Sequence, residues 1–144
     1  KNGKVSTDEN FLREVDVMKD LDHPNICKLL GTFQQERHMF FVMELCEGGE
    51  VFERIMQMGS ISEKATADVI SQVASALAYA HSRGIAHRDV KPENIVYCSK
   101  DPQDTLVKVI DWGLSMCFVG RPMVSAVGSF MYAAPEVIQA TCIS

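Results

Sequence analysis

Two short stretches of the sequence carry side chains suited to binding a metal ion and accepting a proton. Asp89 is followed by Lys91 and, five residues after the aspartate, by Asn94, and a further aspartate, Asp111, stands later in the chain. Carboxylate and amide oxygens are ligands that Mg²⁺ accepts, and a lysine supplies a positive charge for a phosphate group. These residue types at this spacing indicate phosphate chemistry with two metal ligands, one base and one cation.

The motifs around these residues have an order similar to that of protein kinases. The catalytic loop of that family reads His-Arg-Asp with an Asn five residues after the Asp, as at 87–94, and its metal loop is an Asp-x-Gly, as at 111–113. Ala-Pro-Glu at 134–136 follows, with Gly-Ser at 128–129 ahead of it. By itself, a His-Arg-Asp triplet could equally be a turn with a solvated ion pair. Such a turn does not explain why three motifs of the family occur together. On these motifs the chain is identified as a member of the protein kinase family.

That resemblance implies transfer of the γ-phosphate of ATP to a serine or threonine hydroxyl of a protein substrate, with Mg²⁺ as the metal. The protein contributes mostly positioning and neutralisation of charge to such a reaction. The resemblance makes Asp89 the acceptor of the hydroxyl proton. Lys91 marks serine/threonine specificity in the family and would contact the γ-phosphate. Asn94 and Asp111 complete the catalytic set as the Mg²⁺ ligands.

The resemblance also implies an adenine site. The stretch 43–46 is similar to the hinge between the two kinase lobes, where the C=O of Glu44 and both backbone groups of Cys46 would bind adenine. Met43 would close the back of the pocket and Val96 would form its floor, although both also suit a plain core. Glu50 matches an acidic residue that bonds a ribose hydroxyl, but a glutamate is also favoured at a helix start by the helix dipole.

Glu14, taken alone, is a solvated carboxylate in a helix. In the family, the glutamate at this place pairs with a strand lysine that holds the α- and β-phosphates. The sequence contains neither a Val-Ala-Ile-Lys strand nor a Gly-x-Gly-x-x-Gly loop, and Lys1 and Lys4 are too close to Glu14 to replace that lysine. We therefore expect a kinase domain truncated at both ends and, as an isolated chain, inactive or nearly so. A non-catalytic pseudokinase or scaffold module is the alternative.

The elements that must position these residues follow from hydrophobic spacing and turn signals. The expected elements are a helix from 6 to about 20, a hairpin of two strands at 26–33 and 39–43, helices at 50–58 and 62–83, and short strands at 95–98 and 105–110. The helix at 62–83 carries an apolar stripe along one face. Pairing of the last two strands would bring Asn94 and Asp111 together. The resemblance implies an α+β, bilobal kinase-like fold, with residues 1–43 in the N-lobe, 44–49 as the hinge and 50–144 in the C-lobe.

Three positions near the metal loop and the catalytic loop are singled out by the family pattern. Trp112 stands where phenylalanine is usual, and its larger ring carries an N–H that needs a partner. Ser125 is the best-placed hydroxyl for activation-loop phosphorylation. Ser129 is expected near the catalytic loop as a structural hydroxyl.

The stretches 45–55 and 81–85 resemble the calcium/calmodulin-type group, and calcium-dependent protein kinases of plants and protozoa in particular. No EF-hand loop of the Asp-x-Asp/Asn-x-Asp/Asn-Gly type occurs in the 144 residues. Any calcium-sensing region is therefore expected outside this chain.

Charge, hydrophobic runs and cysteine spacing indicate which binding partners and which cellular compartment to expect. The net charge of −5 argues against general binding to nucleic acid. No apolar run approaches the ~20 residues of a membrane segment. The five cysteines form no Cys-x-x-Cys pair, which favours reduced thiols in an intracellular, cytoplasmic protein.

Overall fold

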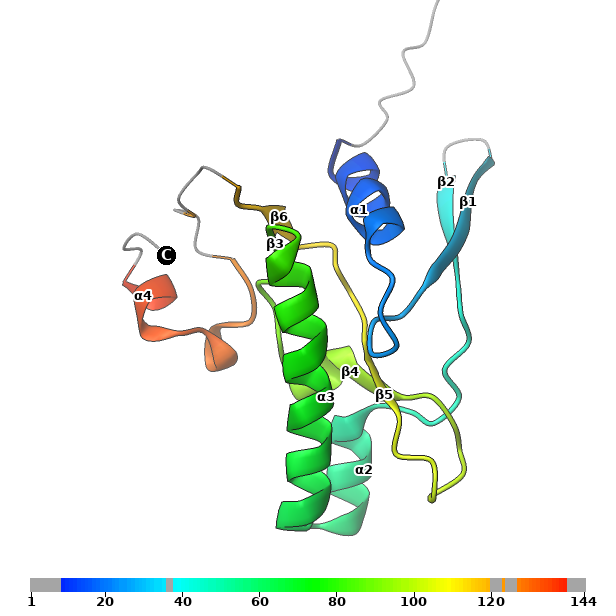
Figure 1. The fold of residues 1–144 in the computed structure, drawn as a ribbon, viewed down its shortest axis with the longest axis vertical. Coiled ribbons are helices and arrows are strands. Elements are labelled where there is room, and N and C mark those ends of the chain that lie inside the picture. Colours follow the sequence, from blue (N-terminus) through cyan, green and yellow to red (C-terminus); the bar gives the residue numbers. More distant parts are fainter. Residues whose placement is uncertain (1–8, 36–37, 120–122, 124–126, 140–144) are drawn as a thin grey trace, which may run out of the picture.

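The computed structural model describes residues 9–35, 38–119, 123 and 127–139 (Figure 1). Its helices and strands are α1 (Glu9–Asp20), β1 (Leu29–Gln35), β2 (His38–Met43), α2 (Val51–Met58), α3 (Glu63–Ser82), β3 (Ile85–Ala86), β4 (Ile95–Tyr97), β5 (Val107–Val109), β6 (Met116–Cys117) and α4 (Pro135–Ile138). All strands pair in two-stranded antiparallel sheets, which confirms the α+β class. None of the helices in these ranges has the length and hydropathy of a membrane span.

The longest helix, α3, forms the centre of the fold, and Figure 1 shows α2 beside its lower half. Ser62 caps α3, since its Oγ accepts the N–H of Ala65 at 3.2 Å, and Gly84, with φ of 71°, follows its last turn. The predicted apolar stripe is confirmed, with Val69, Val73, Ala76 and Ala80 buried. This face packs toward β3 and β5, the strands next to the predicted site.

The β1–β2 hairpin confirms the predicted pairing, with Leu29 opposite Met43, but the predicted start of its first strand was wrong. Ile26 does not continue β1. It forms an isolated bridge to Val109 of β5 instead and is only 2% exposed. The apolar run at 26–33 therefore divides between two sheets, because packing against β5 removes the apolar Ile26 side chain from water.

The β4–β5 hairpin lies next to α3 and carries both predicted loops at its ends. Ile95 lies opposite Val109, and the N–H of Ile110 donates to the C=O of Asn94 at 3.0 Å. Pairing therefore continues to the point where the two loops begin, as the sequence predicted.

A third small sheet, β3–β6, was not expected from the sequence. Ile85 lies opposite Cys117, and Ala86 lies opposite Met116. Strands of two residues have no readable period, so no hydrophobic pattern marks them. The sheet holds the start of the catalytic loop against the segment that follows the metal loop.

Some expectations are not tested by these elements. The predicted helix start at 6–8 and the candidate phosphosite Ser125 lie outside the described residues. The division into an N-lobe, a hinge and a C-lobe stays a prediction.

Candidate functional site

Asp89 lies at the centre of a hydrogen-bond network in the loop between β3 and β4. It is 7% exposed, and its Oδ1 accepts the backbone N–H of Ser129 at 2.7 Å. Its Oδ2 accepts Nζ of Lys91 at 2.8 Å and Nδ2 of Asn94 at 3.1 Å. Nζ of Lys91 donates further to Oγ of Ser129 at 2.8 Å. The structure thus brings three of the four predicted catalytic residues together, with Ser129 beside the loop as expected.

The charges in this network stabilise one another. Burial by itself raises the pKa of Asp89, but hydrogen bonds from Lys91 and Ser129 and the charge of Lys91 outweigh it and lower the pKa to about 2. The pKa of Lys91 is raised, mainly by its hydrogen bond to Asp89. Asp89 is therefore ionised and Lys91 protonated over the whole physiological range.

The catalytic loop is held by backbone contacts at both sides of Asp89. Nδ1 of His87 accepts the N–H of Asp89 at 3.2 Å, and its Nε2 lies 3.0 Å from the C=O of Ile110, so the second nitrogen carries the proton. Burial lowers the pKa of His87, which favours this neutral form. Gly128, with φ of 104°, passes so close to the C=O of Arg88 that a Cβ would overlap it. That approach allows the next residue to reach Asp89.

The side-chain oxygens of the two predicted metal ligands accept few hydrogen bonds from the described residues. Nδ2 of Asn94 donates to the C=O of Asp89 at 2.9 Å, while its Oδ1 accepts no hydrogen bond from the described residues. Asp111 has φ of 60°, a conformation that is uncommon for a residue with a Cβ. Its side chain is exposed, and from the described residues Oδ1 accepts only the N–H of Gly113, at 3.3 Å. One amide and one carboxylate oxygen fit Mg²⁺, which usually takes one or two protein ligands and completes its shell with phosphates and water.

Glu14 approaches the same metal loop from helix α1. A Cβ on Gly113 would lie 3.3 Å from Oδ1 of Asp111 and 3.4 Å from Oε2 of Glu14, so both carboxylates border this glycine. Burial and the charge of Asp111 raise the pKa of Glu14. Glu14 makes no ion pair with the described residues. Two neighbouring carboxylates without a cation between them are suited to receive one.

The predicted hinge follows β2 and lies against β4. The N–H of Gly48 donates to the C=O of Tyr97 at 3.0 Å, and a Cβ on Gly48 would overlap Tyr97, so only glycine allows this approach. Within the described chain, the backbone N–H and C=O of Cys46 make no hydrogen bond. Met43 is half-buried at the end of β2. The hinge therefore presents an unpaired donor and acceptor, as an adenine-binding edge requires.

Glu50 and Val96, predicted for the ribose and the adenine floor, form a bridge between the start of α2 and β4. Glu50 occupies the N-cap position of α2, but its side chain makes no capping hydrogen bond. Its carboxylate is therefore not used by the helix. Val96 is 9% exposed, which suits both a core residue and a pocket floor.

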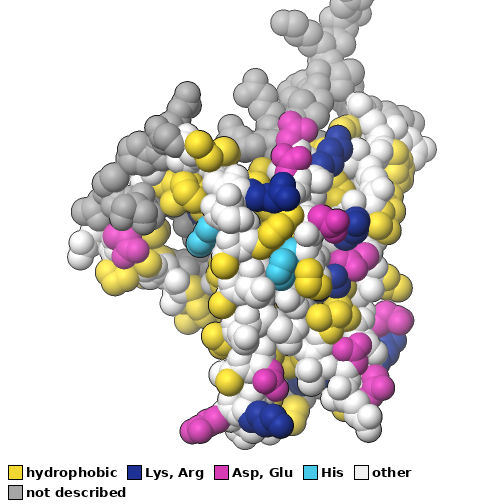
Figure 2. Space-filling view, in the orientation of Figure 1, with side chains coloured by type: hydrophobic (Ala, Val, Ile, Leu, Met, Phe, Trp, Pro, Cys, Tyr) yellow, Lys and Arg dark blue, Asp and Glu magenta, His cyan; other side chains and the backbone are white. Residues whose placement is uncertain are grey.

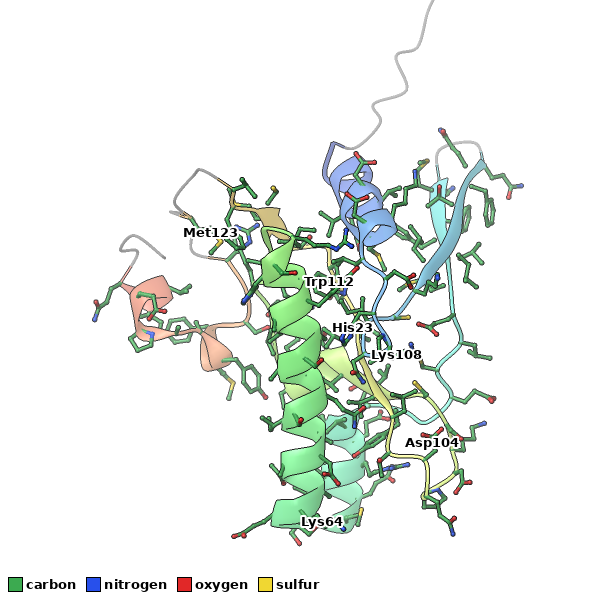
Figure 3. The ribbon with its side chains drawn as sticks, viewed as in Figure 1. His23, Lys64, Asp104, Lys108, Trp112 and Met123 are labelled. Atoms are coloured by element: carbon green, nitrogen blue, oxygen red, sulfur yellow. The ribbon has the colours of Figure 1, made fainter. Side chains whose placement is uncertain are left out.

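An ion pair beside the hinge, between a buried lysine and a half-buried glutamate, was missed by sequence reasoning. Nζ of Lys108 lies 2.8 Å from Oε1 of Glu44 and donates to the C=O of Pro24 at 2.8 Å. The same Oε1 accepts the N–H of Lys28 at 2.6 Å. The hinge, β5 and the segment after α1 are thus tied at one point, and Figure 3 shows Lys108 between α3 and the β1–β2 hairpin. Its only sequence signal is a lysine between two valines of a buried strand.

Three thiols meet behind the hinge, which the sequence did not indicate. The pKa of Cys46 is raised by burial and by neighbouring Cys27. The pKa of Cys98 rises to about 11, first through burial and then through Cys46. All three thiols are therefore protonated at neutral pH and are poor nucleophiles. The described cysteines form no disulfide.

Trp112 fills the space behind the metal loop. It is 0% exposed, and its ring centroid lies 4.6 Å from that of His87. Its Nε1–H, which was expected to need a partner, has none among the described residues. The larger ring is thus accommodated by packing alone.

Known proteins resemble nearly all of this chain. The family model "Protein kinase domain" matches residues 1–144. "Calcium-dependent protein kinase 5" of Plasmodium berghei is 42% identical over 137 residues, covering 94% of this chain and 24% of that protein. "Calcium-dependent protein kinase 14" of Arabidopsis thaliana is 42% identical, covering 94% of this chain and 26% of that protein. "Calcium/calmodulin-dependent protein kinase type 1" of Macrobrachium nipponense is 42% identical, covering 94% of this chain and 38% of that protein. The chain thus spans about a quarter of the length of the two calcium-dependent relatives.

Proposed function

The chain belongs to the protein kinase family, and from this premise we propose that it forms part of a serine/threonine kinase that transfers the γ-phosphate of ATP to protein hydroxyls. The observation that carries the proposal is the network in which Lys91, Asn94 and Ser129 all bond the carboxylate of Asp89. That network holds a base, a cation and a metal ligand within one loop. Such an arrangement suits phosphoryl transfer, where the protein mainly positions groups and neutralises charge.

Asp89 orients the attacking hydroxyl in this proposal. A carboxylate has about four acceptor positions. Its Oδ2 already accepts two hydrogen bonds and Oδ1 only one, so Oδ1 has the capacity to accept the substrate hydroxyl. With a pKa of about 2 it is a weak base, and it takes the proton only as the new O–P bond forms. Lys91 places its charge beside that hydroxyl and next to the phosphate.

Asn94 and Asp111 would hold Mg²⁺ through their unshared oxygens, with Glu14 beside them to position a cation from outside this chain. When bound, Mg²⁺ neutralises negative charge on the phosphate oxygens. Glu44 and Cys46 would read the adenine edge through backbone groups, between Met43 and Val96. Glu50, which does not cap its helix, would accept a ribose hydroxyl.

The proposal is tested by Asp89→Ala in the full-length protein. Removal of the base should lower the rate of peptide phosphorylation by roughly 10²- to 10⁴-fold. ATP affinity should stay near the parental value, because Asp89 does not line the adenine site. Phosphorylation at the parental rate in this variant contradicts the proposal. A parent protein that binds ATP and transfers no phosphate points instead to the pseudokinase or scaffold alternative.

We propose further that the isolated chain is inactive or nearly so, because its sequence contains no glycine-rich phosphate loop and no strand lysine for Glu14. Calcium control, suggested by the printed names of the relatives, is proposed to reside in a region outside this chain. An intracellular, cytoplasmic location is proposed from the unpaired thiols of the described cysteines.

A further inference from the structure

A cavity of about 460 Å³ is lined by residues of α2, the start of α3 and the β4–β5 connection. Figure 1 shows these elements at the lower end of the molecule, where Figure 2 shows both acidic and basic side chains on the surface. The apolar wall of the cavity is formed by Ile55, Met58, Ile61, Ala65, Tyr97 and Pro102. The volume falls within the range of sites that hold small molecules in proteins. None of the residues proposed for catalysis or ATP binding lines it.

The cavity lies on the other side of β4 from the proposed adenine floor. Val96 and Tyr97 are neighbours in this strand, and successive side chains of a strand point to opposite faces. Val96 pairs with Glu50 at the nucleotide side, whereas Tyr97 lines the cavity. A ligand here would therefore bind beside the nucleotide site without entering it.

Among the described residues, Arg54 is the one ionised side chain in the wall of this cavity, and no described aspartate or glutamate lines it. Its guanidinium carbon lies 3.9 Å above the centre of the Tyr97 ring. It makes no ion pair with a carboxylate of the described residues. Stacking on the ring fixes the plane of the guanidinium, and that planar set of donors matches a carboxylate in two parallel hydrogen bonds.

We propose that this cavity is a binding site for a small apolar carboxylate, a ring or short alkyl body with one anionic group. The apolar body would fill the space between Ile55, Ile61 and Pro102, and the carboxylate would pair with Arg54. A cationic ligand is disfavoured because the charge that the described residues place on the wall, that of Arg54, is positive. A neutral ligand of the same shape binds more weakly, since it leaves the guanidinium without its counter-charge.

The probe for the test is 2-naphthoate, whose two fused rings fit within the volume, compared with neutral 2-naphthalenemethanol. Calorimetric titration into the full-length protein should show the acid binding about tenfold or more tightly than the alcohol. Saturating Mg·ATP should leave the acid bound, because the two sites lie on opposite faces of β4. Equal affinity for acid and alcohol, or competitive displacement by Mg·ATP, overturns the proposal.

Three variants complete the test. Arg54→Met should lower affinity for the acid about tenfold and leave the alcohol unchanged. Lys64→Met is the matched control, since Lys64 is exposed at the lower end of α3 and does not line the cavity (Figure 3). Ala65→Leu, which fills the cavity and keeps Arg54, should weaken both ligands and serves if Arg54→Met fails to fold. Wild-type affinity in Arg54→Met or Ala65→Leu, or an equal loss in Lys64→Met, contradicts the site. None of these readouts requires phosphotransfer, so the proposed kinase activity stands or falls separately.

Discussion

The ion pair between Lys108 and Glu44 allows a quantitative prediction about what holds the hinge. The Lys108 side chain is 11% exposed and that of Glu44 is 29% exposed. Lys108→Met keeps the aliphatic volume but leaves the Glu44 carboxylate without its counter-charge and the Pro24 carbonyl without its donor. Removing one partner of a buried ion pair costs about 3–5 kcal/mol. Glu44 is partly solvated and keeps the N–H of Lys28 at 2.6 Å, so we expect about 2–3 kcal/mol here.

Denaturant unfolding of the full-length protein, followed by circular dichroism, measures this loss. Adding Glu44→Gln to Lys108→Met should restore part of the stability, because the amide leaves no buried charge, whereas the Pro24 carbonyl still lacks its donor. Lys100→Met is the matched control: its pair with Glu47 spans 3.6 Å between side chains that are 78% and 57% exposed. It should therefore cost less than about 1 kcal/mol. An equal cost for Lys108→Met and Lys100→Met, or a double variant as unstable as Lys108→Met, refutes the reasoning.

Three further predictions concern the catalytic and metal loops of the full-length protein. Folding lowers the pKa of Asp89 from 3.8 to about 2, so the ionised carboxylate contributes its full stabilisation above pH ~4 and loses it as the pH falls toward 2. In Asp89→Asn, the free energy of unfolding should lack this loss between pH ~4 and ~2. Trp112→Phe removes a buried N–H without a partner among the described residues, but also some packing against His87. The free energy of unfolding should therefore change by no more than about 1 kcal/mol, whereas Trp112→Ala should lower it by about 3–5 kcal/mol. Gly128→Ala forces a Cβ into the C=O of Arg88 at a positive φ. The variant should show a clear loss of kcat with little change in its melting temperature.

Sequence reasoning was most successful where a pattern repeats within one element. The apolar stripe of α3 and the β4–β5 hairpin were both predicted, because side chains at helical or strand spacing report directly on which face is buried. The motif at 87–94 was equally readable, since a short loop places Asp89, Lys91 and Asn94 near one another whatever the rest of the chain does.

It failed where short or divided apolar runs have several burial solutions. Ile26 was assigned to the first strand of the hairpin, yet it bridges to Val109 of β5. β3 and β6 were missed altogether, because two residues are too few to show a period. In each case the outcome depends on which neighbour the rest of the fold supplies.

The sequence alone identified this chain as a member of the protein kinase family and predicted a base, a cation and two metal ligands on two short loops. Only the tertiary structure decided which distant groups complete them: the Ser129 N–H on Asp89, Glu14 beside Asp111, and Lys108 on Glu44. The reason is physical. Local motifs depend on backbone geometry over a few residues, whereas these contacts depend on how separate elements pack, and a single charged residue in a sequence does not identify its partner.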